Sequence, residues 1–145
     1  MIESLEEAKN EIRRADHIIF ISLKYSRTCE VIMNAIHKFI LIFDYGILSL
    51  LKKLEKTKKI KAIPHSPLER AEYVEKYYKD AKKFIKFYRL IKRIVKCEYT
   101  PREEFRKHIT LIVKEKKPIE ITTLVLEDYF EETKEFIRYV ERNII

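Results

Sequence analysis

An apolar run of 21 residues, Val31 to Leu51, constrains the fold of this chain more than any other stretch. Its length would suffice for a membrane-spanning helix. However, Lys38 and Asp44 lie inside the run, and a charge at the centre of a bilayer costs about 2.5–3.5 kcal/mol. A helix that is apolar around most of its circumference is also typical of the centre of a helical bundle. We therefore predict a buried core helix and no membrane span.

The composition favours one helical domain spanning residues 1–145. A chain of 145 residues, 46% of them hydrophobic, can bury one sizeable core. One glycine and four prolines leave few turn residues for a large sheet. The N-terminal segment lacks the basic and apolar regions of a secretory signal, so we expect a cytoplasmic protein. The predicted fold class is mainly α: an antiparallel helical bundle of four to five helices.

Three capping-box patterns, in which a hydroxyl residue is followed three positions later by glutamate, predict where helices begin. They start at Ser4, Ser66 and Thr100, and a proline follows directly after the last two, as suits the first position of a helix. Together with the apolar spacing, these signals predict helices over Leu5–Lys24, from after Thr28 to Lys59, and over Pro67–Lys96, Pro101–Lys107 and Leu124–Asn143.

Residues 109–123 are rich in β-branched side chains and contain a polar break, so a small β-hairpin competes there with a continued helix. We expect the hairpin. In the core helix, Gly46 costs about 1 kcal/mol relative to alanine, which indicates close packing by another helix. We expect Phe39, Ile40 and Leu48 of the same helix to be inaccessible to solvent.

Four stretches together resemble uncharacterised archaeal helical proteins of the HEPN-like group. They are ADHIIFIS, the long apolar helix, IPHSPLERAEYVEKYY and LEDYFEETKEFI, and they span most of the chain. The resemblance rests on this pattern of segments and on no catalytic signature. It implies an antiparallel helical bundle, and it brings no established activity with it.

One candidate catalytic pair also follows from that resemblance. HEPN ribonucleases carry an arginine four to six residues before a histidine, and both act on RNA at a dimer interface. Arg102 and His108 fit this spacing, although Glu103 stands where active members have a small polar residue. The chain's ten arginines and four histidines also produce such a spacing by chance. A ribonuclease, with the homodimer that it implies, is therefore an alternative and not the leading hypothesis.

No metal or cofactor site is predicted. Glu30, His37 and Asp44 recur every seven residues on one face of the core helix, but no second helix offers matching ligands, as a di-metal bundle requires. A polar stripe that is solvated or paired within the chain is the favoured interpretation. The single glycine cannot form a glycine-rich phosphate loop, which excludes the common nucleotide-binding motifs.

The positive charge is concentrated between residues 52 and 96, where 16 lysines and arginines face 5 acidic residues, while the whole chain carries +8. Six cations there follow spacings of three and four, so a continuous helix would line them along one face. We call them the basic stripe: Lys79, Lys82, Lys86, Arg89, Arg93 and Lys96.

Three interpretations of the basic stripe remain open. It binds the phosphates of RNA or DNA together with Lys52 to Lys61, it meets an acidic protein partner, or it is only a solvated face. Dipole compensation concerns the last turn of a helix and does not account for a stripe of this length. The leading prediction is a non-catalytic domain that binds nucleic acid, with Tyr78 beside the stripe as a residue on which a base could stack.

Overall fold

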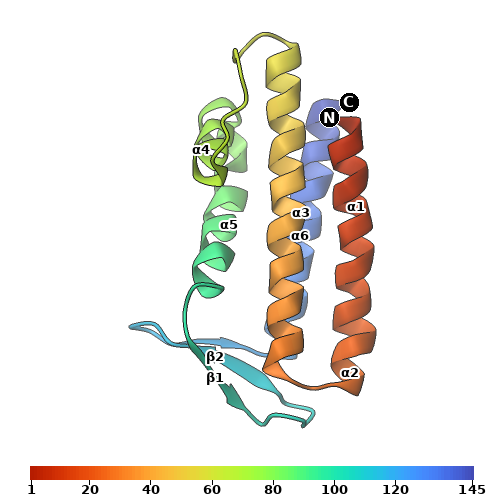
Figure 1. The fold of residues 1–145 in the computed structure, drawn as a ribbon, viewed down its shortest axis with the longest axis vertical. Helices are drawn as coiled ribbons and strands as arrows, with labels where there is room; N and C mark the ends of the chain where they lie inside the picture. The colour runs from red at the N-terminus through yellow and green to blue at the C-terminus, as the bar shows by residue number, and fades with distance from the viewer.

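The computed structural model describes residues 1–145, with α3 (Cys29–Lys56) as the central helix of a bundle (Figure 1). Of its 28 residues, 13 are buried, and by length and composition alone it could also cross a membrane. Phe39 is fully buried, as predicted. Ile40 and Leu48 are only half-buried, so the prediction was wrong for these two, because the neighbouring helices cover only part of the circumference of α3.

The N-terminal rod packs along one side of α3 and consists of α1 (Ile2–His17), a π-helical turn, η1 (Ile18–Ser22), and α2 (Leu23–Tyr25). It confirms the predicted first helix, although the π-helical turn was not foreseen. The prediction that Ser4 caps this helix was wrong. Ser4 lies buried inside α1, where its hydroxyl accepts a hydrogen bond from Lys52 Nζ of α3 at 3.2 Å.

The prediction of one continuous helix over residues 67–96 was wrong. The structure has α4 (Pro67–Tyr77), a 3-10 turn, η2 (Lys79–Ala81), and α5 (Lys82–Ile94). The helix ends at Tyr78, which has φ −126° and ψ 82°, and the chain turns back so that α4 and α5 lie side by side (Figure 1). Tyr78 anchors this reversal, because its O–H donates to the Leu50 carbonyl of α3 at 3.4 Å.

A three-stranded antiparallel sheet closes one end of the bundle (Figure 1). Its strands, in spatial order, are β1 (Tyr99–Arg102), β2 (Thr110–Val113) and β3 (Ile119–Ile121). The β2–β3 pair confirms the predicted hairpin. The capping box at Thr100 and the helix over residues 101–107 were wrong, because Pro101 lies in an edge strand, where a proline is tolerated since no ladder hydrogen bond is lost.

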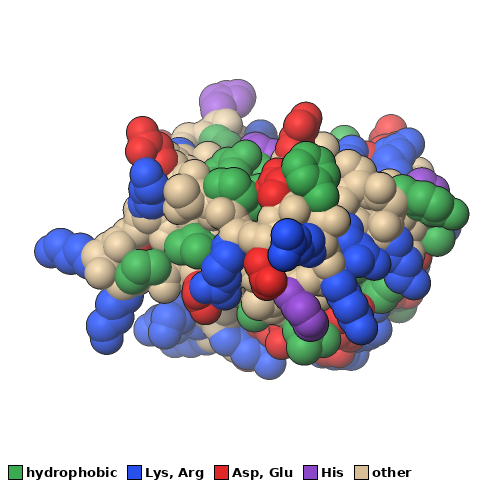
Figure 2. Space-filling model, turned by 90° about the horizontal axis from the view of Figure 1, so that it is seen from below, with side chains coloured by type: hydrophobic (Ala, Val, Ile, Leu, Met, Phe, Trp, Pro, Cys, Tyr) green, Lys and Arg blue, Asp and Glu red, His purple; other side chains and the backbone are tan.

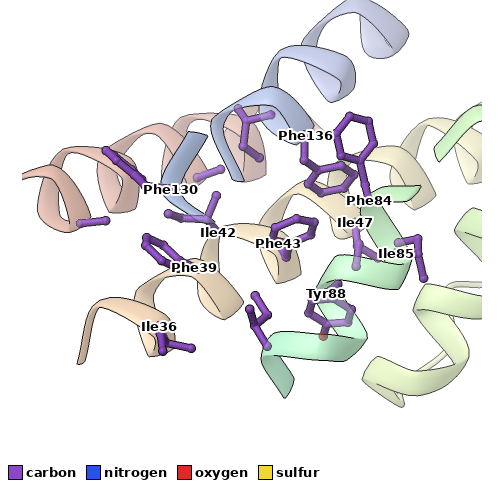
Figure 3. Close-up of a cluster of buried hydrophobic side chains, with 14 of the residues drawn as sticks. Ile36, Phe39, Ile42, Phe43, Ile47, Phe84, Ile85, Tyr88, Phe130 and Phe136 are labelled. Atoms are coloured by element: carbon purple, nitrogen blue, oxygen red, sulfur yellow. The ribbon is translucent and has the colours of Figure 1, made fainter. Parts of the chain in front are cut away.

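The last helix, α6 (Thr123–Ile144), packs behind α3 in the view of Figure 1. Gly46 of α3 allows this contact: a Cβ atom built there would lie 2.7 Å from Phe136 Cε2 and 2.9 Å from Ile137 Cδ1, which confirms the predicted close packing. Beside it, the Phe43 ring stacks on Phe136 at 4.5 Å and on Tyr88 at 5.6 Å (Figure 3). Aromatic contacts therefore join α3, α5 and α6.

Candidate nucleic-acid interface

The break at Tyr78 shortens the basic stripe. Lys79 lies in η2, four stripe residues lie within α5, and Lys96 lies in the turn after α5. The 13 residues of α5 span about 20 Å at 1.5 Å per residue. The stripe is therefore a feature of α5 and its two flanks and does not continue onto α4.

Two arginines of the stripe already have acidic partners. Arg89 forms an ion pair with Glu75 of α4, and Arg93 Nε donates to Glu115 Oε1 of the β2–β3 connection at 2.6 Å. These contacts join α5 to α4 and to the sheet. No local pattern in the sequence indicates these contacts, because each joins positions far apart in the chain.

The remaining stripe residues, Lys79, Lys82, Lys86 and Lys96, are exposed and form no ion pair within the chain. The nearest acid in sequence, Asp80, accepts a hydrogen bond from the Tyr139 O–H of α6 at 2.6 Å. This bond ties η2 to α6 and engages one oxygen of the only carboxylate between residues 79 and 96. The positive charge of the four lysines is therefore balanced by no other side chain of the segment.

Two further lysines of α5 flank the stripe, and the helical spacing did not single them out. Lys83 Nζ lies 4.8 Å from the ring centre of Phe84, and Lys92 Nζ lies 5.6 Å from that of Tyr88. A cation over an aromatic face is attracted by the ring and still has N–H donors to offer. The basic surface of α5 is therefore wider than the single row that the sequence indicated.

Two predicted members of the interface lie elsewhere. Tyr78 is half-buried and packs edge-on against Tyr139, with ring centres 6.4 Å apart, so it is part of the contact with α6 and does not stand free beside the stripe. Lys52 is directed toward Ser4 of α1. Four lysines of the same segment remain exposed at the end of α3 and in the loop before α4: Lys56, Lys58, Lys59 and Lys61.

A cavity of about 440 Å³ lies between the start of α4 and the second half of α5. Its nine lining residues include four cations of α5 and its C-terminal flank, and none is acidic. They are Ser66, Pro67, Leu68, Ala71, Tyr88, Arg89, Lys92, Arg93 and Lys96. The sequence had indicated neither this cavity nor its position at the lower half of the stripe.

The predicted ribonuclease pair lies at the sheet end. Arg102 is the last residue of β1 and forms an ion pair with Glu120 of β3, while His108 is exposed in the β1–β2 connection. The helix expected over residues 101–107 is absent, and the Arg102 guanidinium is engaged by a carboxylate. No contact between the two side chains supports joint action on a substrate.

The sheet end also carries exposed apolar side chains, which appear among lysines and arginines in Figure 2. Tyr25 is 89% exposed and Phe105 is 76% exposed. Phe105 has a φ of 66°, in the left-handed region that a phenylalanine rarely adopts, and its N–H donates to the Arg27 carbonyl at 2.7 Å. This hydrogen bond ties the β1–β2 connection to the segment between α2 and α3.

The three polar side chains on one face of α3 do not converge on a common site. Glu30 and His37 are exposed, whereas Asp44 is half-buried and accepts a hydrogen bond from the Tyr88 O–H. No group of three histidine, cysteine, aspartate or glutamate side chains lies close enough to hold a metal ion.

Comparison of the chain with protein-family models, with curated proteins and with solved structures finds no match. The resemblance to HEPN-like proteins, and the homodimer that it implies, therefore stay predictions. The bundle itself is mainly helical with one small antiparallel sheet.

Proposed function

We propose that this chain is a non-catalytic helical domain that binds RNA or DNA through backbone phosphates, and that the exposed side of η2 and α5 is its contact surface. The observation that carries this proposal is the imbalance of charge over residues 79–96. Eight lysines and arginines stand there against one acid, Asp80, which bonds to Tyr139. Only Arg89 and Arg93 have acidic partners.

Phosphate binding accounts for this imbalance better than solvation alone. A helix dipole favours cations only near its C-terminal turn, whereas Lys82 and Lys83 are the first residues of α5. On a face that only meets solvent, charges of both signs can stabilise the helix by attracting each other. Helix α6 has such pairs in Lys134–Glu131 and Arg138–Glu135. An extended polyanion matches a row of like charges along a helix. An acidic protein partner, the alternative, would have to present a comparable row of carboxylates.

The test measures binding of single-stranded and duplex oligonucleotides by fluorescence anisotropy over a range of salt concentrations. Counterion release predicts that log K falls with log salt at a slope of about −0.7 per neutralised phosphate on single strands and −0.9 on duplex DNA. Four engaged lysines give a slope of about −3 to −4. We expect little preference among base sequences, because phosphate contacts position a strand without specifying it.

The decisive variant replaces Lys79, Lys82 and Lys86 by glutamate. Its matched control replaces Lys24, Arg106 and Lys107, which are exposed at the sheet end, so both triple variants carry +2 instead of +8. We expect the first variant to lose most of the affinity and the salt slope. The control keeps the slope of the wild type. Equal losses in both variants would show that net charge alone attracts the strand and would contradict the proposal.

The same samples test the ribonuclease alternative. We expect the RNA to be recovered intact. Cleavage of RNA that is abolished by His108→Ala would instead support a catalytic role for that histidine, provided that the variant keeps its circular dichroism spectrum. General acid–base catalysis raises a reaction rate by about 10²- to 10⁴-fold, so its loss would be measurable.

A further inference from the structure

The cavity beside the start of α4 exists because α4 lies beside only the first half of α5. Helix α4 begins at Pro67, beside the middle of α5, so the second half of α5 extends beyond it. The buried Ala71 and Tyr88 line the inner side of the cavity. The cavity is therefore closed on the side that faces the bundle core.

Two of its four cations are held in position by acidic residues outside the cavity. Arg89 and Arg93 bond to Glu75 and Glu115, neither of which lines the cavity. A guanidinium has five N–H donors, so each arginine keeps donors for a ligand.

The two lysines add positive charge, and neither forms an ion pair, although the charge of the half-buried Asp44 acts on Lys92. Lys92 Nζ lies 5.6 Å from the ring centre of Tyr88, and a hydrogen bond to Asp44 fixes that ring. Lys96 is exposed, and no ion pair engages it. Two free ammonium groups and two braced guanidinium groups therefore surround one space.

The first turn of α4 adds donors to the same space. Ser66 occupies the N-cap position, but its side chain makes no capping hydrogen bond. The first N–H groups of a helix have no partner within it, and the helix dipole places partial positive charge there. Ser66 lines the cavity, and its hydroxyl, which makes no capping bond, can donate to a ligand. These groups supplement the four cations and would not form a site without them.

We propose that this cavity binds the terminal phosphomonoester of an RNA or DNA strand. This inference rests on the proposed function, because the internal phosphates of the same strand would lie along the upper stripe, Lys79 to Lys86. A phosphate monoester carries about −1.5 to −2 charges at pH 7 and three acceptor oxygens, whereas an internal diester carries one charge. Four cations without a lining acid suit the monoester better. A space closed on its inner side accepts the end of a strand more readily than its middle.

The rim of the cavity suits the nucleoside next to that phosphate. Leu68 is 61% exposed and lines the cavity, so its side chain offers an apolar surface to a sugar or base. The volume of about 440 Å³ lies within the range of about 300–1,000 Å³ that is usual for small-ligand sites. One terminal nucleotide therefore fits the dimensions as well as the charge.

The test compares oligonucleotides of one sequence that carry a 5′-phosphate, a 3′-phosphate or only hydroxyl ends. We expect one of the phosphorylated strands to bind about tenfold more tightly than the hydroxyl-ended strand, as one or two charge-assisted hydrogen bonds imply. The double variant Lys92→Gln/Lys96→Gln should reduce this ratio to about one. The matched variant Lys82→Gln/Lys86→Gln should weaken binding of all strands while the ratio stays the same.

The outcomes separate this inference from the proposed function. Salt-dependent binding of all strands with equal affinity would overturn the end-binding cavity and leave the proposed function standing. A ratio that Lys92→Gln/Lys96→Gln does not change would also overturn it. Inorganic phosphate and a nucleoside monophosphate serve as competitors. If the mononucleotide bound as tightly as the phosphorylated strand, the site would serve free phosphomonoesters and the strand-end assignment would be wrong.

Discussion

Asp44 and Tyr88 form a polar pair between the central helix and α5. Tyr88 is 3% exposed, and its O–H donates to Asp44 Oδ1. Burial raises the pKa of Asp44, while the hydrogen bond from Tyr88 and the nearby charges of Lys92 and Arg70 act in the opposite direction. Burial and the neighbouring carboxylate also raise the pKa of the Tyr88 hydroxyl, so this group stays a donor.

We expect Tyr88→Phe to lower the free energy of unfolding by about 1–3 kcal/mol at pH 7, because it leaves a partly buried carboxylate without its donor. Urea denaturation followed by circular dichroism measures the loss. In an Asp44→Asn background the same substitution should cost less, since no buried charge loses its partner. Equal costs in both backgrounds would mean that the tyrosine contributes through packing of its ring only.

The pair also predicts a pH dependence. The pKa of Asp44 in the folded state lies above its ordinary value of 3.8, so the folded state holds this proton more tightly than the unfolded state. The contribution of Asp44 to stability is therefore greatest below pH 3.8 and falls as the pH rises through the folded pKa. The Asp44→Asn variant should lack this decrease when its unfolding is compared with that of the wild type across the same pH range.

At the scale of whole elements, the contact between α3 and α6 depends on one missing side chain. Gly46 lies against Phe136 and Ile137, both of which are buried. Phe136 is also stacked on Phe43, so its ring cannot move aside without disturbing the aromatic cluster (Figure 3). The close approach of the two helices therefore requires glycine at this position.

We expect Gly46→Ala to destabilise the protein by about 1–3 kcal/mol, the usual range for overpacking of a core, although alanine alone favours a helix by about 1 kcal/mol. Thermal and urea denaturation measure the change. Ser49→Ala, a small substitution at another buried position of α3, is the reference variant, and it removes one hydrogen bond from the Ser49 hydroxyl to the Met1 carbonyl at 3.0 Å. Greater stability of Gly46→Ala than of the wild type would show that the Phe136 ring yields easily.

At the scale of the whole molecule, an unusually apolar helix packs against four other helices. Helix α3 contacts α1, α6, α4 and α5, and the window of it that would suit a membrane is 44% buried inside the bundle. Lys38 of this helix also forms an ion pair with the buried Glu11 of α1, at 3.0 Å. These contacts give α3 protein neighbours where a membrane span would have lipid.

We expect the protein to be extracted and purified without detergent and to keep its circular dichroism spectrum when detergent is absent. The physical reason is that neighbouring helices cover part of the apolar surface of α3, which leaves less of it in contact with water. Fractionation of cells, followed by washing of the membrane pellet with carbonate, measures the distribution. Recovery in the washed membrane fraction would contradict the bundle arrangement around α3.

Local signals in the sequence determined the positions of the strongest elements. The periodic apolar positions and the sparse glycine and proline predicted the helices over residues 2–25, 29–56 and 123–144 to within a few residues. The β-branched run predicted the β2–β3 hairpin. Each of these signals acts through neighbours a few positions apart, either on one helix face or across one turn, and such neighbours can be identified in the sequence alone.

Tertiary contacts decided the rest. The break after α4 lies at Tyr78, whose side chain bonds to Leu50 of α3. Strand β1 forms because Tyr99–Arg102 pairs with β2, although its proline and threonine match a helix start. The same holds for the candidate interface. The sequence indicated its cations, but the partners of Arg89 and Arg93 and the cavity beside α4 arise only where the chain turns back on itself. Contacts between distant residues depend on the packing of whole elements, and no local pattern of residues encodes that packing.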